Sequence, residues 1–272
     1  MIEKKTVKSC KNCTITEVWV QVLGMPSEYK NDPTNPYPLF KNLQTALESD
    51  GHQLDKCTIK KTDNPVLLNI QTGPHKISIS NPFWNGEIIW KENNQKKILR
   101  VGHKFFALHA LFDQNHPYIN YDDSFNKTLC KVINYIDSSN IFDAIQITVR
   151  YVNVMTIGVN QEKKFDVGQY FNTNVSYKLN KRLLNTNFNF EFASSDKRNR
   201  IIGINTIIRG TAMNKVLNIV QTTGVSPLGQ KTKLNDAIVF NEIKSIKEEL
   251  KDVFFDTMTD TTKNKIMGVQ YV

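Results

Sequence analysis

The sequence has no long hydrophobic run, and this absence excludes several classes of protein. Nowhere in its 272 residues does an apolar stretch approach the roughly 20 residues that a membrane-spanning helix needs. Residues 1–8 read Met-Ile-Glu-Lys-Lys-Thr-Val-Lys and lack the apolar segment of a secretory signal. We therefore expect a protein of the cytoplasm that makes no contact with a membrane.

Cysteine is also scarce, with four residues in the chain: Cys10, Cys13, Cys57 and Cys130. Their spacing argues against a disulfide framework in a chain of this length. Cys10 and Cys13 form a CxxC pair, but zinc needs two further ligands in tetrahedral reach, and no second CxxC follows. The five histidines show no HxH or HxxxH spacing. We expect reduced thiols, no metal and no cofactor.

Motifs that would name a reaction are absent. The sequence contains no glycine-rich phosphate loop, no Gly-x-Ser-x-Gly elbow and no His-Glu-x-x-His stretch. Ser226, within Gly224–Gly229, lacks the strand-to-helix context of a nucleophile elbow, so a loop serine is the simpler interpretation. The acidic pairs Asp122-Asp123 and Glu248-Glu249 fit a helix start and a solvated helix face. The sequence therefore does not indicate an enzyme.

Negative charge is in deficit. The net charge is +9 and the isoelectric point is near 9.2, and most of the cations are lysines. Asparagine is abundant as well, so a compositional bias of the coding sequence is one explanation. A surface that faces a polyanion is the other.

What is present is typical of a folded protein, with 40% hydrophobic and 22% charged residues. Apolar spacing predicts helices near 39–47, 118–136 and 236–254, the first ended by Gly51 and the last capped by Asn235 or Asp236. Between them, loops are expected at 160–182 and 224–234. Strands are expected at 15–23, 54–61, 66–71, 76–80, 86–91, 98–111, 140–159, 187–193, 200–209 and 215–223. This order predicts an α+β fold, an antiparallel twisted sheet or sheets with about three main helices.

The segment 140–159 is expected to lie in the middle of the sheet and to join its two halves. Alternating apolar residues mark a strand with one buried face, and the pattern shifts after Tyr151. That shift predicts a bulge or sharp twist near Val152 and Asn153. We expect one domain over 1–272. The alternative is two halves, 14–159 and 183–268, joined by the loop at 160–182.

Three segments together resemble a known family. They are the strand Phe106-Ala-Leu-His-Ala-Leu with the helix after it, the strand Ile147–Val154, and the closing helix followed by Phe254-Phe-Asp-Thr-Met-Thr-Asp. This combination resembles a sporadically distributed, functionally uncharacterised prokaryotic family whose central strand reads Gly-Leu-Arg-Tyr-Ile-Asn. Here Thr148-Val149 stand in place of Gly-Leu. Patchy distribution is typical of defence and toxin–antitoxin-type modules, so the resemblance implies a component of such a module.

Arg150, Tyr151 and Asn153 are the candidate binding residues. Alternation along a strand places Arg150 and Tyr151 on opposite faces, so they share a site only if a bulge re-aims one side chain. The other interpretation is that Arg150 is a paired or surface charge and that Tyr151 packs with its hydroxyl satisfied. With no catalytic motif, we expect a non-enzymatic protein that recognises a protein partner or a ligand.

Nucleic-acid binding through a basic hairpin at 194–209 is the alternative function. Its cations could hold phosphates, and a row of aromatic residues on the preceding strand has the outline of a stacking platform. The cations are Lys197, Arg198, Arg200 and Arg209, and the aromatic residues are Phe188, Phe190 and Phe192. Three phenylalanines at period two also fit a core-facing strand, and that interpretation is the simpler one.

Overall fold

The main element of the computed structural model is one antiparallel sheet of nine strands. Across the sheet the order is β10 (Asn185–Ala193), β11 (Ile201–Gly210), β12 (Lys215–Thr232), β9 (Phe142–Gly158), β2 (Ile15–Pro26), β8 (Phe105–Leu111), β7 (Gln95–Gly102), β6 (Trp84–Glu92) and β3 (Leu54–Lys61). The structure describes residues 7–10, 14–26, 37–61, 67–72, 75–80, 84–92, 95–102, 105–112, 121–138, 142–158, 168, 170–172, 185–194, 199–210 and 215–271. The predicted antiparallel α+β fold is confirmed.

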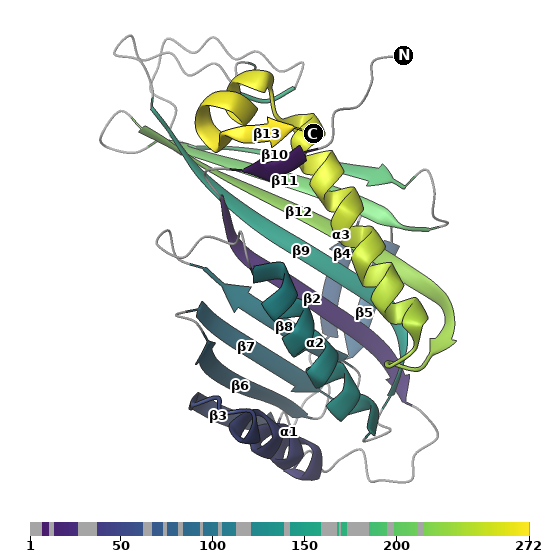
Figure 1. The fold of residues 1–272 in the computed structure, drawn as a ribbon. Coiled ribbons are helices and arrows are strands. Elements are labelled where there is room, and N and C mark those ends of the chain that lie inside the picture. The colour runs from purple at the N-terminus through teal and green to yellow at the C-terminus, as the bar shows by residue number, and fades with distance from the viewer. Residues whose placement is uncertain are drawn as a thin grey trace.

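The long helices lie on one face of this sheet, here called the helical face (Figure 1). They are α1 (Tyr37–Ser49), α2 (Tyr121–Ser138) and α3 (Ala237–Thr257). The opposite face is here called the helix-free face, and the hairpin of β4 (Leu67–Thr72) and β5 (His75–Ser80) lies on that side of the sheet (Figure 1). After α3 come the π-helix η3 (Thr262–Met267) and β13 (Val269–Tyr271), which pairs with β1 (Val7–Cys10). No helix among the described residues is long and apolar enough to cross a membrane.

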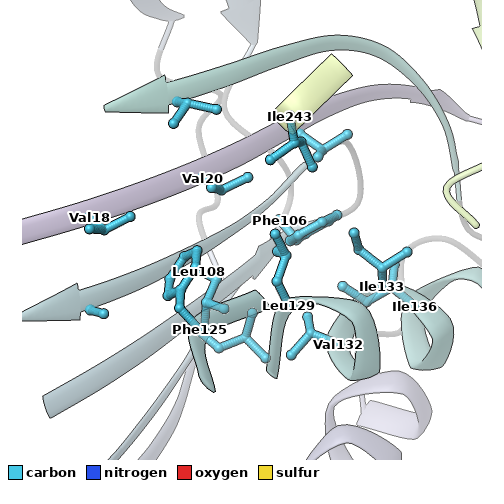
Figure 2. Packing of buried hydrophobic residues seen from close by; sticks show 14 of the residues in the cluster. Val18, Val20, Phe106, Leu108, Phe125, Leu129, Val132, Ile133, Ile136 and Ile243 are labelled. Atoms are coloured by element: carbon cyan, nitrogen blue, oxygen red, sulfur yellow. The ribbon is translucent and has the colours of Figure 1, made fainter. Parts of the chain in front are cut away.

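The core lies between the helices and the helical face of the sheet. Val18, Val20 and Val22 of β2 are fully buried because every second residue of a strand points to the same side. The apolar stripe of α2 packs against this region, as Figure 2 shows for Leu129, Ile133 and their neighbours. Burying a side chain of this size stabilises the fold by roughly 1.5–3 kcal/mol. One cluster of buried residues runs from α1 through α2 to α3.

The strand β9 lies near the middle of the sheet, between β12 and β2, and so joins the two sets of strands as predicted. Its register with β12 is unbroken from Gly158 to Gln146. The predicted irregularity beside Val152 and Asn153 exists, but its extra residue belongs to β2. Ile15 pairs with Asn153 and Glu17 with Val152, which leaves Thr16 as the bulge. The alternation of apolar and polar residues in β9 changes after Tyr151 because the helix-free face there also carries apolar side chains, the half-buried Val152 and Val154.

Two strand boundaries differ from the prediction. The segment 98–111 forms two strands, β7 and β8, joined as a hairpin in which Gly102 pairs with Phe105. The predicted loop at 224–234 is wrong, because β12 continues to Thr232 and pairs with β9 as far as Pro227 and again, after an irregularity in the register, at Thr232. Gly224, at the start of that segment, lies in β12 against α3. A Cβ at Gly224 would lie 2.4 Å from Cγ2 of Ile246 on α3.

Candidate functional site

Arg150 lies near the centre of the helix-free face, within a cluster of polar and aromatic side chains. It shares a row across neighbouring strands with Trp19 of β2 and His109 of β8. Its Nη2 donates to Oε1 of Glu17 at 2.6 Å and lies 3.3 Å from Nε2 of His109. Its Cζ lies 4.4 Å from the centre of the Trp19 ring, within cation–π distance. We call Glu17, Trp19, His109 and Arg150 the Arg150 cluster.

Glu17 is the acidic member of the Arg150 cluster. Nε2 of His109 lies 2.9 Å from its Oε1, the same oxygen that Arg150 contacts. The hydrogen bond with His109 lowers the pKa of Glu17 most, burial opposes it, and the charge and hydrogen bond of Arg150 lower it further, to about 2. A carboxyl with so low a pKa is a permanent anion near neutral pH. It fits the role of holding Arg150 rather than that of a general acid.

Polar side chains continue the cluster along the helix-free face. Gln21 lies beside Trp19 on the sheet, opposite Thr148 of β9, and both are buried. Gln146 is buried as well, while Thr223 pairs directly with Arg150 and is half-buried. Buried polar groups on one sheet face are normally there because hydrogen bonds or ligands satisfy them. The face around Arg150 is therefore polar.

Arg150 keeps hydrogen-bonding capacity in this arrangement. A guanidinium carries five N–H donors, and both polar contacts of Arg150 use Nη2. Its Nε is buried and has no hydrogen-bond partner among the described residues. The side chain is 25% exposed, so part of it faces solvent. These donors suit a planar acceptor such as a carboxylate, or a phosphate.

The other two candidates of the central strand lie on the helical face. Tyr151 is buried in the core beneath the helices. Asn153 is buried too, and its Oδ1 accepts a hydrogen bond of 2.9 Å from Oγ1 of Thr14. The bulge at Thr16 re-aims neither side chain toward Arg150. The structure thus separates Arg150 from Tyr151 and Asn153 by the thickness of the sheet.

The cations of the basic hairpin are not brought together in the described structure. Lys197 and Arg198 lie outside the described residues. Arg200 is 2% exposed and is held by α3, where it donates to Glu242, to Glu249 at 2.7 Å and to Ser245 at 3.2 Å. Burial lowers the pKa of Arg200, but the hydrogen bonds and charges of the two glutamates outweigh it and raise the pKa. In this arrangement Arg200 is part of the packing between β11 and α3.

Arg209 and the phenylalanines of β10 lie on opposite faces of the sheet. Arg209 is exposed on the helix-free face, while Phe190 and Phe192 pair with the buried Ile204 and Ile202 of the helical face. The prediction that this row forms core is wrong for Phe190 and Phe192, which are 41% and 45% exposed. The reason is that α3 packs mainly on β12 and β9, so that of the three phenylalanines Phe188 alone packs against the buried cluster around Phe254.

Cysteine, serine and acidic residues offer no further site in the described chain. No group of three His, Cys, Asp or Glu among the described residues could hold a metal ion. Cys13 lies outside those residues, so the CxxC pair stays untested. Ser226 is not a loop serine: it lies in β12, is buried, and donates to Glu242 at 2.6 Å. Burial raises the pKa of Cys57 and of Cys130.

No protein family, no characterised protein and no solved structure matches this chain. The family resemblance therefore rests on the quoted segments alone. The sequence alone named Arg150 as a candidate but did not point to Glu17, Trp19 and His109, which lie beside it in the structure. These residues come from two other strands, and only the register of β2 with β8 and β9 brings them to Arg150. One sequence signal was available: Glu17 and Trp19 are two residues apart on a predicted strand, so their side chains are expected on the same face.

Proposed function

We propose that this chain is a non-enzymatic recognition protein that binds an acceptor-bearing ligand or partner segment at the Arg150 cluster. The arrangement of the Arg150 guanidinium supports this proposal most directly. It is oriented by Glu17, His109 and Trp19, yet keeps donors that no described residue uses. A pre-oriented guanidinium recognises a carboxylate or phosphate with little loss of side-chain freedom on binding. The family resemblance supports a role in a prokaryotic defence or toxin–antitoxin-type module.

The chemistry of the cluster also favours binding over catalysis. The low pKa of Glu17 leaves no proton to donate near neutral pH, and its oxygen is already engaged by two partners. Arg150 itself cannot act as a base, because a guanidinium stays protonated in proteins. The described members of the cluster thus provide orientation and charge.

Co-purification from the native host tests the proposal. Wild-type protein, Arg150→Gln and the control Arg209→Gln are used as bait, since Arg209 is an exposed arginine on the same face of the sheet. We expect Arg150→Gln to lose a bound species that wild type and Arg209→Gln both retain. Identical sets of bound species would contradict the proposal. So would turnover of a substrate by pure protein that one side-chain change abolishes.

Binding of nucleic acid stays as the second candidate because Phe190 and Phe192 are exposed on a strand face, where bases could stack. The buried Arg200 and the acidic residues of α3 that hold it count against this function. Affinity for RNA or DNA that falls steeply with salt would support it. In that case Phe190→Ala and Phe192→Ala should weaken binding, and Arg150→Gln, on the opposite face of the sheet, should not.

A further inference from the structure

The two edges of the nine-stranded sheet differ in how they are protected. An edge strand has one row of unpaired backbone N–H and C=O groups, and natural proteins protect such edges with lysine, proline or a bulge. At one edge, β3 carries Lys56, Lys60 and Lys61, and its register shifts between Leu54 and Lys56. This edge has the usual protection against pairing with another chain.

The edge strand β10 has none of these protections. Its sequence is Asn-Thr-Asn-Phe-Asn-Phe-Glu-Phe-Ala, without lysine, arginine or proline. All nine residues pair with β11 in one uninterrupted register from Asn185 to Ala193. Among the described strands it has β11 as its single neighbour. A regular, bulge-free and nearly uncharged edge of this kind is suited to pair with a further strand.

Two of the three large hydrophobic side chains that are exposed in the described chain lie on β10. They are Phe190 and Phe192, and the third is Ile238 at the start of α3. Both phenylalanines lie on the helical face, while Asn187, Asn189 and Glu191 lie on the other. The partner of this edge must therefore offer apolar side chains on one face and polar side chains on the other.

We propose that a second copy of this chain pairs with β10, strand to strand and antiparallel, about a two-fold axis at Phe190. In antiparallel pairing, directly opposite residues lie on the same face. With Phe190 on the axis, Phe190 meets its own copy, and Phe188 meets Phe192 of the partner subunit. Glu191 then lies opposite Asn189 of the partner subunit. The strand is thus complementary to itself on both faces.

Neighbouring registers fit less well. An axis at Glu191 would oppose two carboxylates directly, which destabilises a strand pair. An axis at Asn189 would leave Phe192 facing a threonine, Thr186, of the partner subunit. The register centred on Phe190 alone matches all three phenylalanines, and aromatic cross-strand pairs are among the favourable ones. The resulting dimer would have a continuous sheet, with the helices of both copies on the same face.

Sedimentation equilibrium of the full chain tests the dimer. We expect wild type to be dimeric and Phe190→Lys to be monomeric, because two lysines would meet at the axis. Ile238→Lys is the matched control, since it also replaces an exposed hydrophobic residue but lies away from β10, and it should stay dimeric. Circular dichroism checks that each variant is folded. A monomeric wild type, or a dimeric Phe190→Lys, would overturn the proposal.

Cross-linking tests the register independently. In a background with the four native cysteines replaced by serine, Phe190→Cys should form an intermolecular disulfide on oxidation, because opposite Cβ atoms of a strand pair lie roughly 4.5–5.5 Å apart. Asn187→Cys should not cross-link, because its own copy lies six residues away along the pair. Cross-linking at position 187 and not at 190 would overturn the proposed axis.

Discussion

At the scale of single residues, the molecule uses ion pairs in two different ways. Arg150 is 25% exposed, and its Nε has no hydrogen-bond partner among the described residues. Arg200, by contrast, is 2% exposed and is held by Glu242 and Glu249 of α3 beside the start of β11. We interpret the first as a binding site and the second as structural, and each interpretation makes a separate prediction.

The first prediction concerns the pH dependence that Glu17 confers. Its pKa in the folded chain, about 2, lies below the ordinary value of 4.5. The stabilisation is therefore fully present above pH 4.5 and is lost as the pH falls from 4.5 toward 2. Its size is on the order of 3 kcal/mol. Urea unfolding should show wild type more stable than Glu17→Gln at about pH 6, with the difference reduced at about pH 3. An equal difference at both pH values would contradict the assignment.

The second prediction concerns Arg200. Arg200→Met leaves Glu242 and Glu249 close together without their cation, so it should lower the free energy of unfolding by about 3–5 kcal/mol. Replacing both glutamates by glutamine in the same variant should recover much of that loss. Arg209→Met is the control and should change stability by no more than about 0.5 kcal/mol, because Arg209 is exposed. If Arg200→Met and Arg209→Met were equally stable, the buried pair would have no structural role.

At the scale of elements, the packing of α3 on β12 depends on close approach at Gly224. The added Cβ of Gly224→Ala would meet Ile246 Cγ2 at 2.4 Å and Ile202 Cδ1 at 3.3 Å. We expect a loss of about 1–3 kcal/mol from overpacking. Gly203→Ala in the adjacent strand is the control, since its nearest neighbour would be a carbonyl oxygen at 3.8 Å. Thermal unfolding of the two variants measures the difference, and equal melting temperatures would show that α3 can shift at no cost.

Elements that depend on local sequence patterns were predicted, and those that depend on contacts distant in sequence were not. Local patterns predicted the helices, the cap at Asp236, which accepts from Ile238 N–H at 2.8 Å, and the central position of β9. The loop predicted at 224–234 was wrong because Gly224 is required by α3, a contact over more than 20 residues of sequence. Phe190 and Phe192 were misassigned to the core because alternation shows which residues share a face, and not whether a helix covers it. Glu17, Trp19 and His109 were missed because strand register is a tertiary property.

At the scale of the whole molecule, the core cluster that links α1, α2 and α3 predicts one cooperative unit. Denaturant unfolding followed by fluorescence and by circular dichroism should give coincident single transitions. Limited proteolysis should cut first within 160–182, where the sequence predicts a loop, and not within 224–232, which lies in β12. Two fragments that fold separately after that cut would instead support two halves.

If the guanidinium of Arg150 receives the ligand on the helix-free face, as we propose, its own N–H signal is the most direct probe of binding. The chain has six arginines, so the Nε–Hε region of a ¹⁵N-correlated NMR spectrum is simple, and comparison with Arg150→Lys assigns the Arg150 signal. Phosphate and acetate are titrated as probes, followed by any species identified by co-purification. We predict a saturable shift of the Arg150 signal, while the signal of the enclosed Arg200 stays in place. An unmoved Arg150 signal in the presence of a ligand that the protein demonstrably binds would contradict a binding role for Arg150.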